Sequence, residues 1–208
     1  MNWKLIVKDK ANQPDKGTYT DWKEQIAEEC FYQCIYCSIN EAQFGGIDHY
    51  HIEHYKPKSI DKFKTLENDI CNLFYSCPIC NKFKSNDWPN DADDLQAICY
   101  PDPSEYDYSD LFNINPDDYK VYGRYASTRY MTERLYLNRP QLLYERREAF
   151  LQQRAEKVTK ALEILQGLID VQKDVSLLKE SHLGIIELVK TIQKRNKIRP
   201  YKLAEIRK

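Results

Sequence analysis

The residues of this chain whose types and spacing predict chemistry most directly are two Cys-x-x-Cys pairs. They read Cys34-Ile-Tyr-Cys37 and Cys77-Pro-Ile-Cys80. A Cys-x-x-Cys turn presents two thiolates to one tetrahedral ion, and two such turns complete a closed four-sulfur zinc site of the structural kind. Because a closed site leaves no coordination position for a substrate, we expect Cys34, Cys37, Cys77 and Cys80 to bind a structural zinc ion.

The segment between the two pairs is where we expect the reactive groups. Zinc sites of this kind usually have about 15–20 residues between the pairs, and the insert here is longer. It contains His49, His51 and His54, together with the carboxylates Asp48 and Glu53. The insert therefore combines histidines and carboxylates, which are side chains that bind metals and transfer protons.

The other cysteines are Cys30, Cys71 and Cys99, and we expect them to be small buried apolar residues. A competing interpretation places the paired cysteines in disulfides or leaves them unliganded in the core. The sequence shows no signal peptide and no apolar stretch of about 18 residues. We therefore expect a cytoplasmic protein without a membrane segment, and a reducing compartment favours metal binding over disulfides.

The two halves of the chain carry opposite charge, although the formal net charge of the whole is only −1. Residues 1–119 contain 11 Lys and Arg against 22 Asp and Glu, whereas residues 120–208 contain 20 against 10. The basic half could neutralise phosphates, which is the main sequence-independent source of nucleic-acid affinity. A solvated helix surface or a contact with the acidic half explains the same charges, so both interpretations stay open.

The elements expected around the cysteine pairs are short. Asp21-Trp-Lys-Glu24 has the pattern of a capping box, which predicts a helix over residues 22–31 that leads into the first pair. Pro78 predicts a turn that opens a short helix within the second pair. Further along, residues 119–125 around Gly123 predict a small hairpin.

Longer helices are expected in the second half of the chain. A helix over residues 128–137 precedes a long amphipathic helix that starts at Gln141. A second amphipathic helix around residues 178–192 ends near Pro200, and the reversal between the two falls within residues 166–174. We expect the two long helices to pair as an antiparallel hairpin, with most of the apolar stripe used in core packing.

The motif around the histidines resembles that of HNH (ββα-metal) nucleases. In that family an acidic residue and a histidine end one strand, and a proline follows three positions later. An asparagine precedes the second cysteine pair, and a His or Asn follows it. This chain has Glu53-His54, Pro57, Asn72 and Asn81 in these places, and Lys84 at the family's lysine position.

Two segments resemble a narrower group, the PtuB-like HNH nucleases of Septu and retron anti-phage systems. They are His51-Ile-Glu53-His54-Tyr-Lys-Pro57-Lys58-Ser59 and Leu137-Asn138-Arg139-Pro140. The resemblance implies an α+β, mostly helical fold with a zinc-stapled ββα-metal core and a C-terminal antiparallel helical extension. We expect a nuclease core over residues 1–100, an acidic connector with a hairpin and a helix over residues 101–138, and the helical hairpin over residues 139–208.

The resemblance gives catalytic roles to His54, Glu53, Asn72 and Asn81. Hydrolysis of a phosphodiester needs a base to deprotonate water, and a neutral imidazole suits that task at physiological pH, so His54 is the expected base. Glu53 and Asn81 offer the oxygen ligands that a hard cation prefers, which favours Mg²⁺ or Mn²⁺. By resemblance, Asn72 would orient the loop that holds His54 through hydrogen bonds.

Three further residues of the insert and the segment after it have roles that the sequence leaves open. His51 is two residues from Glu53, so both side chains share a face of an extended strand, and His51 could be a third metal ligand or support one. The pair Asp48-His49 lacks the following proline, and we expect His49 at the surface. Lys84 is an additional candidate for the site.

The function expected from these residues is that of a metal-dependent endonuclease that acts on nucleic acid, with DNA favoured over RNA. The alternative is a non-catalytic zinc-knuckle module that binds nucleic acid or protein. The chain has no Gly-x-x-x-x-Gly-Lys-Ser/Thr loop, so an ATP-dependent step would need another protein. The Septu-like resemblance implies an SMC- or ABC-like ATPase partner (PtuA-like), and the long C-terminal helices are the expected docking element.

Overall fold

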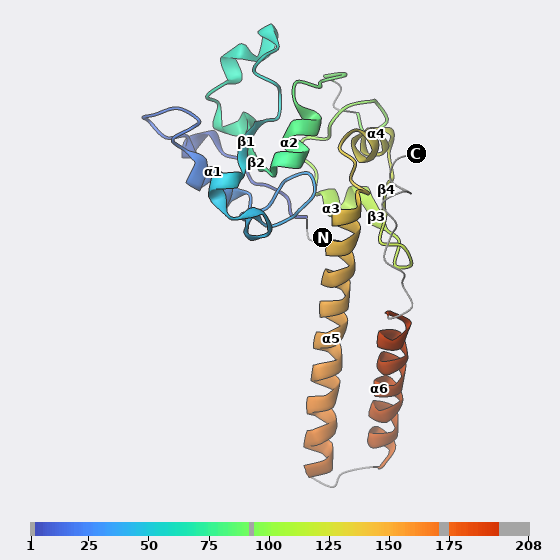
Figure 1. Cartoon of the computed structure of the whole chain (residues 1–208). Helices are drawn as coiled ribbons and strands as arrows, with labels where there is room; N and C mark the ends of the chain where they lie inside the picture. Colours follow the sequence, from blue (N-terminus) through green and yellow to red (C-terminus); the bar gives the residue numbers. More distant parts are fainter. Residues whose placement is uncertain (1–2, 92–93, 171–174, 196–208) are drawn as a thin grey trace. The chain divides into compact units, whose positions relative to one another are not determined.

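The computed structural model describes residues 3–91, 94–170 and 175–195, and it divides the chain into two compact units (Figure 1). Residues 1–145 form the first unit and residues 146–208 the second. The first unit mixes helices with two small antiparallel sheets. The predicted three-part division of the chain stays a prediction.

Short helices and strands make up the first unit. The α-helices are α1 (Lys23–Glu29), α2 (Pro78–Lys84), α3 (Tyr108–Leu111) and α4 (Ala126–Arg134), and the strands are β1 (His51–His54), β2 (Leu73–Ser76), β3 (Phe112–Ile114) and β4 (Val121–Gly123). Short 3-10 helices lie at Lys10–Asn12, Glu41–Phe44, Ile47–His49, Asp61–Leu66 and Ile70–Asn72.

The N-terminal helix forms where it was predicted, but its predicted cap does not. The N-cap of α1 is Trp22, and no side chain accepts a capping hydrogen bond there. The Asp21 carboxylate instead accepts a hydrogen bond from the Thr18 backbone N–H at 2.8 Å. Asp21 therefore closes the turn before the helix, and the capping-box prediction was wrong because this local turn competes for the same carboxylate.

Strands β1 and β2 pair in antiparallel register and lead directly into α2, which gives the order strand, strand, helix (Figure 1). Every residue of β2 is buried, whereas exposure varies along β1. Pro78 occupies the first turn of α2, where its missing N–H has no intrahelical partner to lose. Glu53 faces Phe74 and His54 faces Leu73 in the register, so β2 fixes both acid and histidine.

The second sheet corrects the hairpin prediction. Strand β3 pairs with β4, and Gly123 lies opposite Phe112 rather than at the turn between two strands. A side chain at Gly123 would meet the backbone of Thr128 at 2.4 Å, which is closer than any real contact. Gly123 is therefore required because α4 packs against it, and the sequence pattern had assigned it to a turn instead.

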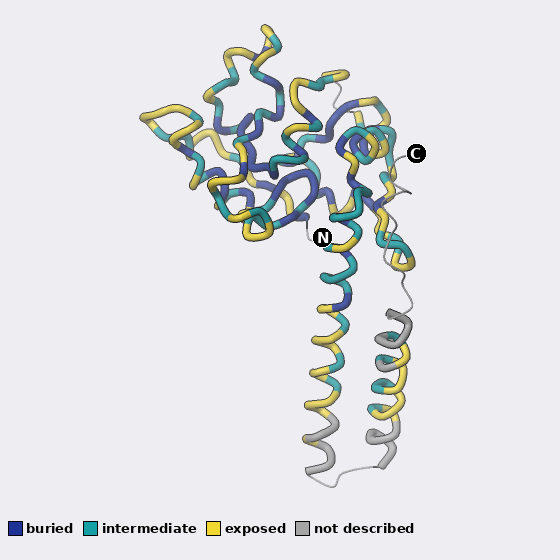
Figure 2. Tube along the Cα trace, in the orientation of Figure 1, coloured by how far each residue is buried: buried dark blue, intermediate teal, exposed yellow. Residues whose placement is uncertain are grey.

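The hydrophobic core of the first unit contains buried residues from both small sheets and from helices α1, α2, α3 and α4 (Figure 2). Many of its largest buried side chains are tyrosines, namely Tyr36, Tyr50, Tyr75, Tyr100 and Tyr108. A buried tyrosine hydroxyl needs a partner. Tyr50 and Tyr108 each donate to a backbone carbonyl at 2.7 Å, and the other three donate to carboxylates. The core therefore includes polar contacts that fix the loops around the cysteine pairs.

Two long helices follow α4 in the chain. Helix α5 spans Pro140–Asp170, and α6 spans Val175–Arg195. Both predicted amphipathic stretches are helical, and α5 continues through Gly167, where the reversal was expected. Residues 171–174 and Pro200 lie outside the described residues, and the antiparallel pairing of the two helices stays a prediction. Within the described residues, neither these nor the shorter helices could cross a membrane.

Candidate active site and zinc centre

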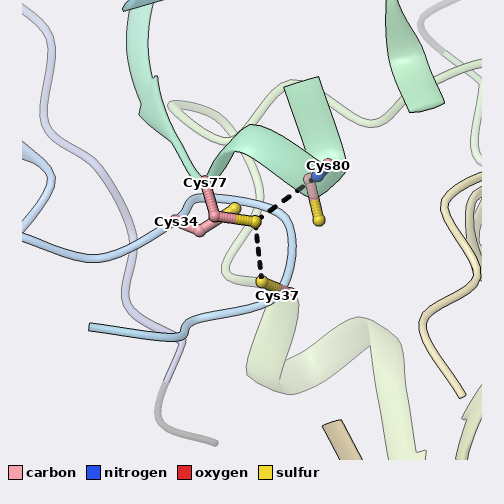
Figure 3. Close-up of side chains that lie close together, drawn as sticks. All are labelled: Cys34, Cys37, Cys77 and Cys80. Carbon is pink, nitrogen blue, oxygen red and sulfur yellow. Dashed lines mark hydrogen bonds between the residues drawn. The ribbon is translucent and has the colours of Figure 1, made fainter. Parts of the chain in front are cut away.

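The four predicted zinc ligands come together as one buried cluster (Figure 3). The sulfurs of Cys34, Cys37, Cys77 and Cys80 all lie within 4.8 Å of one another. A tetrahedral zinc ion bonded to sulfurs at about 2.3 Å would hold them about 3.8 Å apart. The Cys37 and Cys77 sulfurs are 3.7 Å apart, so the cluster fits a closed four-sulfur zinc site. The disulfide interpretation is not supported, since all seven cysteines are free.

Backbone hydrogen bonds shape the two Cys-x-x-Cys turns. In the first, Ser38 adopts a positive φ of 52° and its N–H donates to the Cys34 carbonyl at 2.7 Å. In the second, Cys77 is the N-cap of α2, and its sulfur accepts from the Cys80 N–H at 3.4 Å. The Ile35 N–H donates to the Tyr75 carbonyl at 3.0 Å, which joins the first turn to β2.

Arg139 contacts the cysteine cluster from outside the two turns. Its terminal nitrogens lie 3.6 Å from the sulfurs of Cys37 and Cys80 and 3.9 Å from that of Cys77. Burial alone would lower the pKa of Arg139, but the neighbouring cysteine sulfurs raise it above its ordinary value. Arg139 belongs to a segment that resembles PtuB-like nucleases, but its contact with the cluster could not be predicted, because no sequence spacing connects it to cysteines so far away in the chain.

Three of the four residues with predicted catalytic roles line one surface pocket. Glu53 and His54 reach it from β1, and Asn81 reaches it from α2. The remaining lining residues are Ile52, Pro57, Lys58, Ser59, Ser85 and Asn86. Because Asn81 directly follows the zinc ligand Cys80 on α2, the cysteine cluster fixes the same helix that places the amide. The pocket thus offers an imidazole together with carboxylate and amide oxygens.

Glu53 is held by a buried ion pair with Lys84. Its Oε1 lies 2.6 Å from the Lys84 ammonium, and the two side chains are 3% and 0% exposed. Tyr36 also donates its hydroxyl to Oε1 at 3.4 Å. Burial raises the pKa of the Glu53 carboxyl, and the Lys84 ammonium opposes that rise. Lys84 further donates to the His54 carbonyl at 3.1 Å, so it fixes both the carboxylate and the strand.

His54 is oriented by a backbone carbonyl and an aromatic ring. Its Nε2 lies 3.0 Å from the Glu67 carbonyl oxygen. A carbonyl can only accept, so the neutral ring carries its proton on Nε2 and leaves the Nδ1 lone pair free. The Tyr19 ring packs edge-on at 4.8 Å between centroids. Burial lowers the pKa of His54 below its ordinary value, which favours the neutral imidazole at physiological pH.

Asn72 contacts the backbone of the segment that follows His54 and does not line the pocket. Its Oδ1 accepts from the Lys56 N–H at 2.8 Å, and its Nδ2 donates to the Lys56 carbonyl at 3.0 Å. Nδ2 also lies 3.3 Å from the Leu66 carbonyl. Asn72 therefore connects the segment after β1 to the segment that contains Glu67, the partner of His54. Its role in orienting the base stays a prediction.

The remaining histidines of the insert do not line the pocket. His51 is exposed at the start of β1 and is not among the residues that line the pocket. Its role as a metal ligand stays a prediction. Asp48 and His49 lie in the exposed 3-10 helix Ile47–His49, which agrees with the expectation of a surface histidine.

Lys58 belongs to a segment that resembles PtuB-like nucleases, but it was not predicted to line the pocket. Its ammonium lies 2.7 Å from the Glu67 carboxylate and 2.8 Å from the Tyr19 hydroxyl. Lys58 also contributes to the lowered pKa of His54, after the larger effect of burial. Its position one residue after Pro57 was the only sequence feature that could have placed Lys58 at the site. Its contacts with Tyr19 and Glu67 form only in the folded chain.

The order of β1, β2 and α2 with an adjacent four-cysteine cluster is consistent with one class of site, a zinc-binding ββα core. Comparison with protein families agrees with this class. Residues 34–87 match the family model for HNH endonuclease. The matched segment contains every cysteine of the cluster and also Glu53, His54 and Asn81. The match supports an HNH nuclease. No match was found among the curated proteins or among the solved structures.

Proposed function

We propose that this protein is a metal-dependent HNH endonuclease that hydrolyses phosphodiester bonds of nucleic acid. The observation that carries the proposal is the meeting of Glu53, His54 and Asn81 around one pocket. The family match over residues 34–87 supports the same activity. A base and two oxygen ligands at one open site are the groups that metal-assisted hydrolysis requires.

His54 is the proposed general base. Its Nδ1 accepts a proton from a water molecule as the water oxygen bonds to phosphorus and the ester P–O bond breaks. The departing oxygen then takes a proton from solvent. The Glu67 carbonyl, 3.0 Å from Nε2, keeps the ring in the required tautomer and stabilises the imidazolium that forms.

Glu53 and Asn81 are the proposed ligands of the catalytic cation. Their carboxylate and amide oxygens fit a hard divalent ion, so Mg²⁺ or Mn²⁺ is expected there. Such an ion would offset negative charge on the scissile phosphate and on the departing oxygen. Lys84 engages one carboxylate oxygen of Glu53, and this fixes the direction of the other.

The finer assignment rests on the resemblance to PtuB-like nucleases. We propose that the chain is the nuclease subunit of a cytoplasmic anti-phage complex, with DNA as the favoured substrate and an SMC- or ABC-like ATPase as its partner. The long helices α5 and α6 are the proposed docking element. A chain shortened at Glu145, where the second unit begins, should lose the ATPase in a copurification experiment, and retained binding would contradict this assignment.

A non-catalytic zinc-knuckle module is the second candidate. The closed cysteine cluster favours it, because such a cluster can hold a binding surface without any reaction. A binding module does not, however, explain the buried Glu53–Lys84 pair beside His54, whose ring is oriented by the Glu67 carbonyl. We therefore prefer the nuclease.

The test of this proposal is cleavage by the purified full chain. Plasmid, single-stranded DNA and total RNA are each incubated with the protein in Mg²⁺, in Mn²⁺ and without a divalent ion. Divalent-dependent cleavage of any of them supports the nuclease and identifies its substrate. Absence of cleavage from every reaction, both with the chain alone and after addition of the ATPase, would favour the binding module.

A further inference from the structure

Arg139 reaches the zinc-binding cluster from the turn between α4 and α5, a part of the chain outside the segment that matches the HNH family. Its two terminal nitrogens contact the sulfurs of Cys37, Cys77 and Cys80 at 3.6–3.9 Å. Two of these cysteines come from the second turn and one from the first. The guanidinium therefore spans both halves of the cluster.

The charge of a loaded cluster explains why a cation would be placed there. Four thiolates around one Zn²⁺ ion leave a net charge of about −2 in a site that is closed to water. All four cysteines are buried. A buried charge is costly unless it is paired and hydrogen-bonded, and a planar guanidinium can serve several sulfurs at once. Arg139 supplies both the charge and the N–H donors.

Capping of α4 accounts for only part of the position of Arg139. One terminal nitrogen donates to the Leu135 carbonyl at 3.2 Å and lies 3.5 Å from that of Tyr136. The Nε atom is buried and has no hydrogen-bond partner among the described residues. Burying Nε without a hydrogen bond costs free energy, which capping of α4 alone does not explain. Contact of the guanidinium with three sulfurs compensates for that cost.

We propose that Arg139 is an outer-sphere partner of the zinc centre, which donates hydrogen bonds to its thiolates, offsets their charge and ties the α4–α5 turn to the zinc-binding segment. Zinc thereby fixes a part of the chain that lies more than fifty residues beyond its last ligand. This role is independent of the nuclease proposal, because a binding module would need it equally.

Zinc retention by the full chain tests the role directly. Arg139→Gln removes the charge and keeps a donor, and Arg139→Lys keeps the charge but loses the fork of N–H groups. Competition with a chromogenic zinc chelator should show affinity lowered about 10–100-fold in Arg139→Gln, the usual effect of losing an outer-shell partner, and lowered less in Arg139→Lys. The exposed Arg129→Gln on α4 is the matched control and should bind zinc like the wild type.

Cobalt substitution separates this role from simple stabilisation of the fold. In the Co²⁺-loaded protein, the sulfur-to-cobalt charge-transfer band should shift in Arg139→Gln and in Arg139→Lys but not in Arg129→Gln. Wild-type zinc affinity with an unshifted band in either folded Arg139 variant would overturn the proposal, even if that variant were less stable. If Arg139→Gln does not fold, Arg139→Lys alone decides.

Discussion

At the scale of single residues, the Glu53–Lys84 pair shows how the site keeps a carboxylate in a dry environment. Both side chains are almost completely buried, and their charged atoms are 2.6 Å apart. Removing one member of such a pair leaves an unpaired buried charge, which typically costs about 3–5 kcal/mol. We therefore expect Lys84→Met to lower the free energy of unfolding by about 3–5 kcal/mol in a urea titration.

The exposed Lys82 on the same helix provides the control for that prediction. Lys82→Met should change stability little, and the double variant Glu53→Gln/Lys84→Met should recover part of the loss because no unpaired charge remains. A Lys84→Met protein as stable as Lys82→Met would contradict the importance of the pair.

Asn72 gives a prediction about activity rather than stability. Its side chain makes hydrogen bonds to both the N–H and the carbonyl of Lys56 and lies near the Leu66 carbonyl. Asn72→Ala should displace the segment that holds His54 and lower kcat/KM for nucleic-acid cleavage about 100-fold, as a misplacement of about 1 Å can. Zinc content should stay at the wild-type level. The exposed Asn90→Ala should cleave normally, and equal activity of the two variants would refute a positioning role for Asn72.

Several residues could be predicted because their signal is local. The Cys-x-x-Cys spacing located the four-sulfur cluster, since each turn is only four residues long. Neither the Lys58 contacts beside His54 nor the Arg139 contacts with sulfur could be predicted. They depend on which distant segments the fold brings together, and a single sequence does not contain that information.

At the scale of elements, Asp87 joins the end of the HNH-like segment to α4. Its carboxylate accepts from Tyr100 at 2.7 Å, accepts from Tyr130 and pairs with Arg134 at 3.1 Å. Burial raises the pKa of Asp87, but the hydrogen bonds from Tyr130 and Tyr100 and the contact with Arg134 outweigh this and hold it below its ordinary value.

A depressed carboxyl pKa fixes the sign of the effect of pH on stability. The unfolded chain binds a proton near pH 3.9, approximately the ordinary value for aspartate, before the folded protein does. The stabilisation by Asp87 is therefore fully present above that pH and is lost as pH falls through the lower folded-state pKa. We expect Asp87→Asn to be less stable than the wild type at pH 7, and the difference to shrink below about pH 4.

Urea titrations of the wild type and Asp87→Asn at each pH measure the difference in free energy of unfolding. Zinc release in acid affects both proteins alike and cancels in the difference. The exposed Asp110→Asn is the control and should follow the wild type throughout. A stability difference between Asp87→Asn and the wild type that stayed constant from pH 7 to pH 3 would show that the carboxylate charge does not hold α4 in place.

Helices could be predicted where apolar residues repeat over many turns. Short elements could not, where one residue type fits two different local structures. The stretches that became α5 and α6 repeat apolar residues over many turns, and both are helical. The hairpin around Gly123 failed because a glycine signals either a turn or a close approach of backbones. Here it permits the approach of α4, and the partner strand β3 lies earlier in the chain.

At the scale of the whole molecule, the cysteine cluster connects the fold to the proposed reaction. It holds α2, which carries Asn81, and it contacts Arg139 at the start of the C-terminal helices. Because structural zinc contributes folding energy directly, Cys77→Ser or exhaustive chelation should unfold the region around the site and lower zinc content from one ion per chain. Circular dichroism and elemental analysis measure both. A folded Cys77→Ser protein with unchanged zinc would refute the zinc assignment.

The fold class of the first unit was accessible from sequence because motif residues and zinc ligands occur within one continuous segment. The arrangement of Glu53, His54 and Asn81 around a single pocket was not, since it requires the register of β1 on β2 and the direction of α2. The partner and the biological setting have no local signal at all, and they stay proposals.

A comparison of three proteins tests whether His54 activates water in a divalent-metal nuclease site. The wild type, His54→Ala and the surface control His49→Ala are purified identically and matched for zinc content. Each is assayed with Mg²⁺ or Mn²⁺ on plasmid, single-stranded DNA and RNA. The ATPase is added if the wild type alone does not cleave. We predict cleavage by the wild type and by His49→Ala, and its loss in His54→Ala. Undiminished cleavage by a folded, zinc-loaded His54→Ala protein would show that His54 is not the base.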